Sequence, residues 1–365
     1  MAWFTTRTDE LAQAISGRLQ QVTFNNCVGV NVEQLFRKAL EKDPRMLALL
    51  SGYEFNYITS NGIVRDYTIL LQYNADAPGD LSDILVDNGS WNAQSLLTKG
   101  APGQVTLVSK NRQAIRQQLN DNLGRLVSLY EGIHGYNMNS GGFPSLTDYE
   151  LLKISFDYIM PMNQLRQYQA QAQRAARTAW QTILGKAQVP PAIKPFLALS
   201  YLTQEAIYDH RCHDEVRSNS AAIPTDPIPH LGYGPLVEKR GICSGLAWAF
   251  KHMMDAARIE CICVTGYLKS DRSVGHMWNM VKLDNQYYHV DLAVGIDNDG
   301  VCVCRMMQPD IVFRSDHEWN TADYPVAYGS RFDYDYVEEY LAEHEIDLLR
   351  QGAEEKYLFP ERIID

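Results

Sequence analysis

Residues 241–266 read GICSGLAWAFKHMMDAARIECICVTG, and residues 275–291 read GHMWNMVKLDNQYYHVD. The first stretch predicts a helix that begins at Cys243, because apolar residues recur at helical spacing and a strand-like run follows. The second stretch predicts two antiparallel strands, because alternating apolar residues flank Asp284-Asn285, a pair that suits a two-residue turn. A helix followed by an antiparallel sheet is typical of the α+β class.

The predicted hairpin brings two chemically useful side chains to one face. A two-residue turn pairs Leu283 with Gln286, and counting back makes His276 and Asp291 diagonal neighbours on the same face. Diagonal Cβ atoms lie about 7–8 Å apart, a distance that an imidazole and a carboxylate can span. His289 shares this face and is the alternative base. The opposite face is expected to pack in the core, and it consists of Met277, Val281, Leu283, Val290, Leu292 and Val294.

Cys243 occupies a position that suits a nucleophile. It follows Gly241-Ile242 at a predicted helix start, where free backbone N–H groups and the helix dipole favour a thiolate. A thiolate can attack an acyl carbon, an imidazole can take and return the proton, and a carboxylate can orient the imidazole. Cys243, His276 and Asp291 fit these roles in that order. The alternative is that Cys243 is a buried structural cysteine.

Together these motifs resemble the transglutaminase-like superfamily. The resemblance rests on a cysteine in a Gly-Cys-x-Gly-type context, a Gly-His-x-Trp-Asn strand and a Tyr-His-Val-Asp strand, and it covers roughly residues 192–328. It implies a papain-like fold, in which an N-terminal catalytic helix packs on an antiparallel sheet. It also implies that Cys243 is the nucleophile, His276 the general base and Asp291 the residue that orients the base. The segments FRSDHEWNTADYPVA, YDH and YGPL resemble bacterial members.

Three features depart from the bacterial pattern. Asp291 is followed by Leu-Ala-Val-Gly where relatives continue with a Thr-Trp-Asp type run, and Leu246 stands where an aromatic residue is common. Many relatives with this kind of N-terminal region are exported, whereas this N-terminus lacks the basic start and apolar stretch of a signal peptide. No apolar run approaches the roughly 18 residues that cross a bilayer. We therefore expect a cytoplasmic protein without a membrane partner.

The oxyanion site needs a second donor beside the Cys243 N–H group. Tyr233, Gln204 and Trp278 could each supply it, and Tyr233 is favoured because it lies in the loop that leads into the predicted catalytic helix. A packed aromatic ring is the alternative interpretation of Tyr233.

No cofactor and no metal are expected. Cys261-x-Cys263 and Cys302-x-Cys304 could form a four-thiolate set if two strands met, but zinc sites usually use Cys-x-x-Cys turns. Residues 297–300, Asp-Asn-Asp-Gly, resemble part of a calcium loop without the rest of its ligand pattern, so a turn is favoured.

An internal repeat precedes these motifs. QVTF at residues 21–24 has a counterpart in QVTL at 104–107, and Gly52-Tyr53 recurs as Gly135-Tyr136 at the same offset of about 83 residues. Each repeat is predicted to be a strand, a helix and a hairpin. The predicted helices lie near 32–40 and 112–130, and the predicted hairpins turn at Asn61-Gly62 and within Gly141–Pro144.

The internal repeat and the residues that end predicted helices together indicate the domain boundaries. Residues 162–184 are rich in Ala, Gln and Arg, which favours a long helix, and Val189-Pro190-Pro191 ends that segment. A further helix is predicted over 192–210. The predicted divisions are an N-terminal module at 1–160 with βαββ repeats at about 1–78 and 100–160, a connecting helix at 161–189, a catalytic domain at 190–345 and a tail at 346–365.

Composition limits the classes of function. The chain has 365 residues and a net charge of −11, which disfavours nucleic acid as a partner, and its seven cysteines do not suggest a disulfide framework. The sequence thus predicts a cysteine-dependent acyl-transfer enzyme that acts on amide bonds of a protein or peptide. The reaction would be peptide or isopeptide hydrolysis, or glutamine deamidation or transamidation, through an acyl-enzyme. The alternative is an inactive fold that serves as a binding or structural module.

Overall fold

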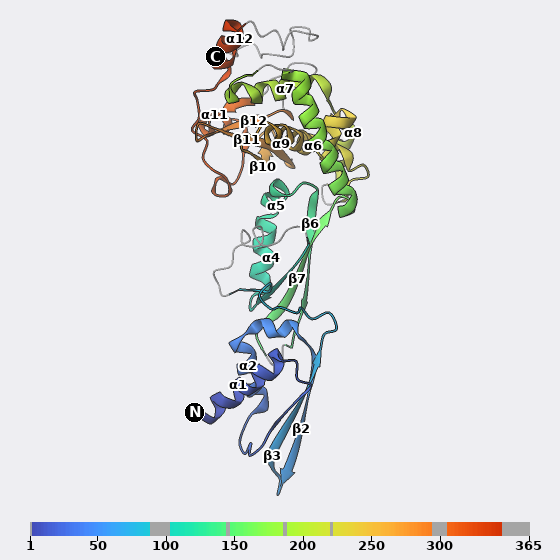
Figure 1. The fold of residues 1–365 in the computed structure, drawn as a ribbon, viewed down its shortest axis with the longest axis vertical. Coiled ribbons are helices and arrows are strands. Elements are labelled where there is room, and N and C mark those ends of the chain that lie inside the picture. Colours follow the sequence, from blue (N-terminus) through green and yellow to red (C-terminus); the bar gives the residue numbers. More distant parts are fainter. Residues whose placement is uncertain are drawn as a thin grey trace. The chain divides into compact units, whose positions relative to one another are not determined.

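The computed structural model describes residues 2–87, 103–143, 147–184, 188–219, 222–293 and 305–344 (Figure 1). The chain divides into two compact units. The N-terminal unit comprises residues 1–122 and 135–157, and the C-terminal unit comprises residues 123–134 and 158–365. Among the described residues, no helix combines the length and the apolar character needed to cross a membrane.

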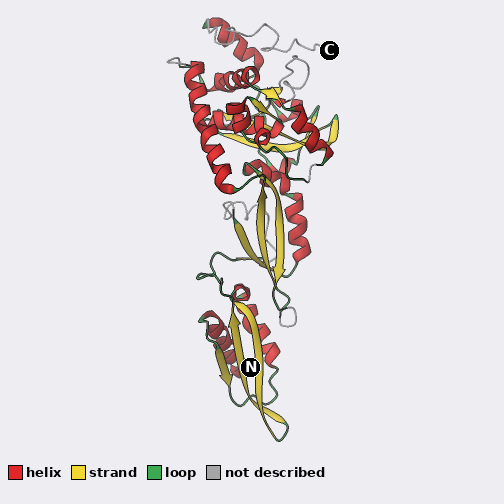
Figure 2. Cartoon of the chain, turned by 90° about the vertical axis from the view of Figure 1, so that its right-hand side faces the viewer, coloured by secondary structure: helices red, strands yellow, loops and turns green. Residues whose placement is uncertain are grey.

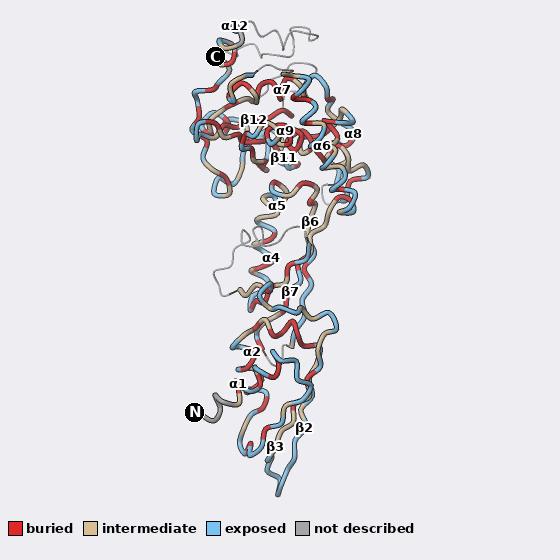
Figure 3. Tube along the Cα trace, viewed as in Figure 1, coloured by how far each residue is buried: buried red, intermediate tan, exposed pale blue. Residues whose placement is uncertain are grey.

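The first half of the N-terminal unit is a three-stranded antiparallel sheet covered by helices. Its elements are α1 (Ala2–Ser16), β1 (Gln21–Phe24), α2 (Val32–Lys42), β2 (Leu50–Ser60) and β3 (Ile63–Tyr73), and the strand order is β1-β3-β2. The helices lie on one face of this sheet (Figures 1 and 2). The far end of the β2–β3 hairpin is exposed (Figure 3). Ser60 pairs with Ile63, and Asn61 and Gly62 both have positive φ, which confirms the predicted turn.

The second half of this unit contains a break that the sequence pattern did not predict. Its elements are β4 (Leu85–Val86), β5 (Gln104–Ser109), α4 (Arg112–Asp121), β6 (Ile133–Gly141) and β7 (Glu150–Tyr158), in the strand order β4-β5-β7-β6. The single helix expected over 112–130 is wrong, because α4 ends at Asp121 and α5 (Leu123–Leu129) begins after Asn122. The Asn122 side chain donates to the Gln118 carbonyl at 2.8 Å, a local bond that competes with helix continuation.

The C-terminal unit is built around a five-stranded antiparallel sheet in the order β13-β12-β11-β10-β14. The strands are β10 (Cys261–Leu268), β11 (Asp271–Leu283), β12 (Gln286–Asp291), β13 (Arg305–Gln308) and β14 (His317–Glu318). Leu283 pairs with Gln286, and Asp284 and Asn285 have φ of 47° and 60°. The predicted two-residue turn and the register of the β11–β12 hairpin are therefore confirmed.

Helix α9 (Cys243–Ala256) packs on this sheet, and α6 (Met162–Leu184) and α7 (Lys194–Glu205) pack against α9. The bounds of α6 confirm the long helix predicted from composition. The helix predicted over 192–210 is wrong at its C-terminal end. After α7 the chain enters β8 (Ile207–Tyr208), which pairs in parallel with β9 (Arg240–Gly241), and α8 (His210–Ser218) then begins. The last helix described is α12 (Tyr334–Glu343).

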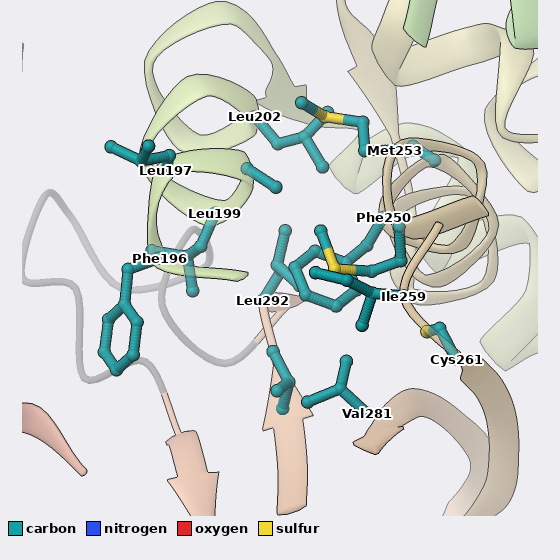
Figure 4. Close-up of a cluster of buried hydrophobic side chains, with 14 of the residues drawn as sticks. Phe196, Leu197, Leu199, Leu202, Phe250, Met253, Ile259, Cys261, Val281 and Leu292 are labelled. Atoms are coloured by element: carbon teal, nitrogen blue, oxygen red, sulfur yellow. The ribbon is translucent and has the colours of Figure 1, made fainter. Parts of the chain in front are cut away.

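The core of the C-terminal unit lies between α9 and the sheet. Phe250 and Met253 of α9 belong to one buried cluster with Leu199 and Leu202 of α7 and Val281 of β11, and Met253 lies beside Leu202 (Figure 4). The predicted core face of the hairpin is buried at Met277, Val281, Leu283, Val290 and Leu292, and Val294 lies outside the described residues. The opposite face is buried too, because Phe313, Tyr324 and Ala327 cover Trp278 and Met280.

Residues 123–134, here called the strap, pack within the C-terminal unit. Glu131 of the strap is buried, and its carboxylate accepts from the Gly232 N–H group at 2.8 Å and lies 3.2 Å from His252 Nε2. The Ser128 hydroxyl lies 3.2 Å from the Tyr324 hydroxyl. These buried polar contacts fix the strap against α9 and the segment that precedes it.

Candidate active site

Cys243 is the first residue of α9, and this helix start has no side-chain cap. The N-cap residue Ile242 is extended and its apolar side chain accepts no hydrogen bond. The first N–H groups of α9 therefore remain available to an anion near the Cys243 sulfur. Cys243 is 8 % exposed, so only a small part of this residue is accessible from outside.

Two neighbouring residues hold this helix start in place. Gly245 is required there, because a Cβ atom would clash with the Pro229 carbonyl oxygen. Arg240 lies three residues before Cys243, and its Nη1 contacts Asp226 Oδ2 at 2.7 Å and Asp209 Oδ2 at 3.0 Å. Arg240 thus joins the start of α8 and the loop before α9 to the strand that leads into Cys243.

The structure brings His276 and Asp291 into direct contact. His276 Nε2 lies 2.6 Å from Asp291 Oδ2, and Asp291 Oδ1 accepts from the Ala293 N–H group at 2.9 Å. The Cys243 side chain lies within hydrogen-bonding reach of the His276 ring. The three residues thus form one connected series, in which Asp291 is buried and His276 is nearly so.

The charges of this series follow from its burial and its contacts. Burial by itself lowers the pKa of His276, but Asp291 and Cys243 outweigh it and raise that pKa to about 10. Burial opposes ionisation of Asp291, but His276 and His317 outweigh it and hold the pKa of Asp291 well below its usual range. The arrangement therefore stabilises an imidazolium beside the Cys243 sulfur at neutral pH.

Asn279 fixes the helix of Cys243 to the strand of His276. It is fully buried on β11, and its Nδ2 donates to the Ala247 carbonyl of α9 at 3.0 Å. Ala247 lies one helical turn after Cys243, and Asn279 lies three residues after His276. The Gly-His-x-Trp-Asn motif contains this asparagine, but its spacing alone does not reveal the anchoring role.

His317 is a second histidine on Asp291. It begins β14 and is buried, its Nε2 lies 3.0 Å from Asp291 Oδ2, and its Nδ1 lies 2.6 Å from Asp316 Oδ1. Nothing in the sequence pattern predicts this contact, because it depends on β14 pairing with β10 across the sheet. In the sequence, only the motif Phe-Arg-Ser-Asp-His at residues 313–317 drew attention to this segment.

Both ring nitrogens of His289, the alternative base, form hydrogen bonds with residues other than Cys243 and Asp291. Trp278 Nε1–H donates to His289 Nδ1 at 3.0 Å, so the proton of the neutral ring is on Nε2, which donates to Asp310 Oδ1 at 2.8 Å. Burial outweighs Asp310 and lowers the pKa of His289. Both ring nitrogens are occupied, and the N–H group of Trp278 is also unavailable to an oxyanion.

Tyr233 and Gln204, the other two candidate oxyanion donors, each contact a neighbouring side chain. Tyr233 precedes the π-helical turn Gly234–Glu238, and its ring packs on Tyr168 with 4.6 Å between the centroids. Gln204 Nε2 donates to the Ser200 hydroxyl at 2.9 Å. Packing against Tyr168 favours a mainly structural role for the Tyr233 ring.

Among the described residues, one cluster of side chains has the donor atoms and the spacing of a metal site. His276, Asp291 and His317 form one group with donor atoms within 4.8 Å of one another, and the hydrogen bonds given above account for that spacing. Cys261 and Cys263 are buried on β10, and burial raises the pKa of the Cys261 thiol to about 12. Cys302, Cys304 and the loop at 297–300 lie outside the described residues.

The C-terminal unit contains a cavity of about 230 Å³, and Cys243, His276 and Asp291 are not among the residues that line it. Ser244 and Met277 line it, and these residues directly follow Cys243 and His276 in the chain. Trp248 of α9, Ile133 of the strap and Glu215 of α8 form other parts of its wall. The Ser244 hydroxyl is buried and has no hydrogen-bond partner among the described residues.

Comparisons with known proteins place this region in a family. The model of the transglutaminase-like superfamily matches residues 202–292, which include Cys243, His276 and Asp291. No curated protein sequence matches the chain. One solved structure described as a TGase has 10 % identity and a TM-score of 0.30, and the match covers 68 % of this chain and 67 % of that chain. Another, a candidate cysteine protease from Cytophaga hutchinsonii, has 12 % identity and a TM-score of 0.27 over 53 % and 71 % of the two chains. Residues 202–292 of this chain are therefore similar to the transglutaminase-like superfamily.

Proposed function

We propose that this protein is a cysteine-dependent acyl-transfer enzyme that cleaves amide bonds of a peptide or isopeptide. One observation carries the proposal: His276 contacts both Cys243 and Asp291, while Cys243 stands at an uncapped helix start. This is the arrangement that a thiolate–imidazolium pair requires, because the helix start stabilises the thiolate and Asp291 stabilises the imidazolium. The transglutaminase-like match supports a papain-like cysteine enzyme in general.

The reaction follows from these positions. The Cys243 thiolate attacks the amide carbonyl carbon, so that a C–S bond forms and the oxygen becomes an oxyanion near the N–H groups of α9. The C–N bond then breaks, and the imidazolium of His276 gives its proton to the leaving amine. A water molecule, or a second amine, next attacks the thioester while His276 accepts its proton. The C–S bond breaks and the thiolate returns, with hydrolysis or transamidation as the outcome.

The alternative, an inactive binding module, rested on the altered run after Asp291. In the structure the Ala293 N–H group donates to Asp291 Oδ1, a main-chain bond that does not need a Thr-Trp-Asp type sequence. The altered run therefore keeps the carboxylate oriented toward His276, which supports the catalytic proposal.

Selective alkylation tests the proposal without a known substrate. A limiting amount of iodoacetamide at pH 7 should place a single adduct on Cys243, as read by intact mass and peptide mapping, and His276→Ala should abolish this selectivity. Cys212 is an internal control, because it also lies 3.3 Å from a histidine, His230. Burial raises the pKa of Cys212 to about 12 and lowers that of His230 to about 4, so this pair stays neutral and should not react.

Labelling that is slow, or is spread over several cysteines, would overturn the proposal of an activated thiolate. When labelling is selective, peptides that contain glutamine or branched lysine amides are then tested with and without a fluorescent primary amine. Release of amine in water alone assigns hydrolysis, and incorporation of the fluorescent amine assigns transamidation.

A further inference from the structure

We propose that His317 is a positioning residue, which shares one oxygen of Asp291 with His276 and thereby weakens the hold of Asp291 on the catalytic imidazolium. The inference rests on the proposed function, since it assigns a role at the same site. It begins with Asp291 Oδ2, which lies 2.6 Å from His276 Nε2 and 3.0 Å from His317 Nε2.

The direction of these hydrogen bonds is fixed by chemistry. An ionised carboxylate only accepts, so both Nε2 atoms carry protons and donate to the same oxygen. The other nitrogen of His317 lies 2.6 Å from Asp316 Oδ1, and it donates there for the same reason. Asp316 is in turn held by Arg305, whose Nε donates to Asp316 Oδ2 at 2.7 Å. His317 therefore uses both of its N–H groups on carboxylates.

The result is a row of alternating charges. From the nucleophile outward the groups are the Cys243 thiolate, the His276 imidazolium, Asp291, the His317 imidazolium, Asp316 and Arg305. Each charge inside the row lies between two neighbours of opposite sign, and only Cys243 and Arg305 at its ends have a single neighbour. Asp291 is buried, so little solvent screening reduces the competition between its two imidazolium donors.

The ring of His317 has little freedom to leave this position. It is fully buried and stacks on Phe313, with 3.9 Å between the centroids and 25° between the planes. Trp278 meets it edge-on at 5.1 Å. These two rings hold the Nε2–H group toward Asp291, as a residue with a positioning role requires.

The other charged groups nearby are already paired. On the far side of Phe313, His289 donates to Asp310, and Asp310 also contacts Arg314. The stacked ring of Phe313 separates this pair from His317. His317 is thus the cationic donor that competes with His276 for Asp291 among the described residues.

The contact of His276 and His317 with the same Asp291 oxygen affects the proton transfer in the proposed reaction. His276 must give its proton to the leaving amine, and an imidazolium held too tightly by its carboxylate is a poor acid. A second donor on the same oxygen draws part of the carboxylate charge away from His276. His317 would thus hold His276 in an orientation that suits catalysis while easing proton release.

Two variants, His317→Leu and His317→Gln, test the inference. Leucine removes the donor and the charge, so the hydrogen bond from His276 to Asp291 should strengthen. We expect the His276 Nε2–H proton resonance to move downfield at pH 7, and the alkaline inflection of Cys243 alkylation to rise by about one pH unit, a tenfold change in imidazolium stability. Glutamine keeps a neutral N–H donor and should restore part of both shifts.

The outcomes separate this inference from the proposed function. If wild-type Cys243 is not selectively alkylated, the proposed function fails and the inference fails with it. If wild-type labelling is selective but His317→Leu leaves the resonance and the inflection unchanged, or moves them the other way, only the inference is overturned. If His317→Leu does not fold, His317→Gln provides the test. In that variant the His276 resonance and the alkaline inflection must both move in the direction expected for leucine, by a smaller amount, and unchanged values overturn the inference.

Discussion

Replacement of Asp291 by asparagine should remove most of the acid function of His276. Asp291, together with Cys243, raises the pKa of His276 from 6.5 to about 10 against the effect of burial. Without its charge, burial is opposed mainly by Cys243, so that the pKa should fall below 6.5. The change of about 3.5 units corresponds to about 5 kcal/mol at ~1.36 kcal/mol per unit. At pH 8 the protonated fraction of His276 would fall from about 99 % to below about 3 %, a loss of at least about 30-fold.

Steady-state kinetics between pH 5 and 11 check this expectation. Amide turnover at pH 8 should fall by at least about 30-fold, and by up to about 10⁴-fold if the asparagine amide also reverses the tautomer of His276. An activated ester with the same acyl group should lose less, because its leaving group needs no proton. Asp255→Asn is a matched control, since Asp255 is half exposed on the same helix as Cys243 and pairs with Lys251. A loss below tenfold, or an alkaline limb that stays near pH 10, would refute the reasoning.

Three further outcomes follow from the site. Gly245→Ala should lower the melting temperature and the Cys243 alkylation rate together, because its Cβ would clash with the Pro229 carbonyl and cost about 1–3 kcal/mol; an unchanged melting curve contradicts the clash. His289→Ala should lower the unfolding free energy by about 3 kcal/mol, because the Trp278 donor and Asp310 lose their partner. Cys243 should nevertheless remain selectively alkylated in this variant. Loss of that selectivity in the folded variant would restore His289 as the base. The unfolding free energy should decline as pH rises from about 6.5 to about 10, since the raised pKa of His276 gives stability that is complete below 6.5. Denaturant titrations should show a flatter profile for His276→Gln than for wild type.

The β11–β12 hairpin was predictable because its determinants are local. Asp284-Asn285 suits a turn with two positive φ angles, and the alternation of apolar residues then sets the register that the pairing of Leu283 with Gln286 confirms. That register alone brings His276 near Asp291. Helix α6 was predictable for a similar reason, since its composition favours a helix throughout 162–184.

The features that escaped prediction depend on distant parts of the chain. His317 reaches Asp291 only because β14 pairs with β10, and no local period encodes that pairing. His289 shares a face with Asp291, and only the N–H group of Trp278 and the carboxylate of Asp310 show that its nitrogens are occupied. The breaks after Asp121 and Glu205 likewise reflect a side-chain bond and a strand pairing that outweigh helix propensity.

The strap has a consequence for how this protein can change over evolutionary time. Residues 123–134 belong to the C-terminal unit, whereas the residues on both sides of them belong to the N-terminal unit, so the chain passes between the units after residues 122, 134 and 157. A gene fusion or deletion that joined only the sequence from 158 onward to another protein would leave His252 without Glu131. Exchange of either unit by recombination would need three joints in frame at once. Replacement of one unit alone would therefore have to preserve all three joints as well as the contact between Glu131 and His252.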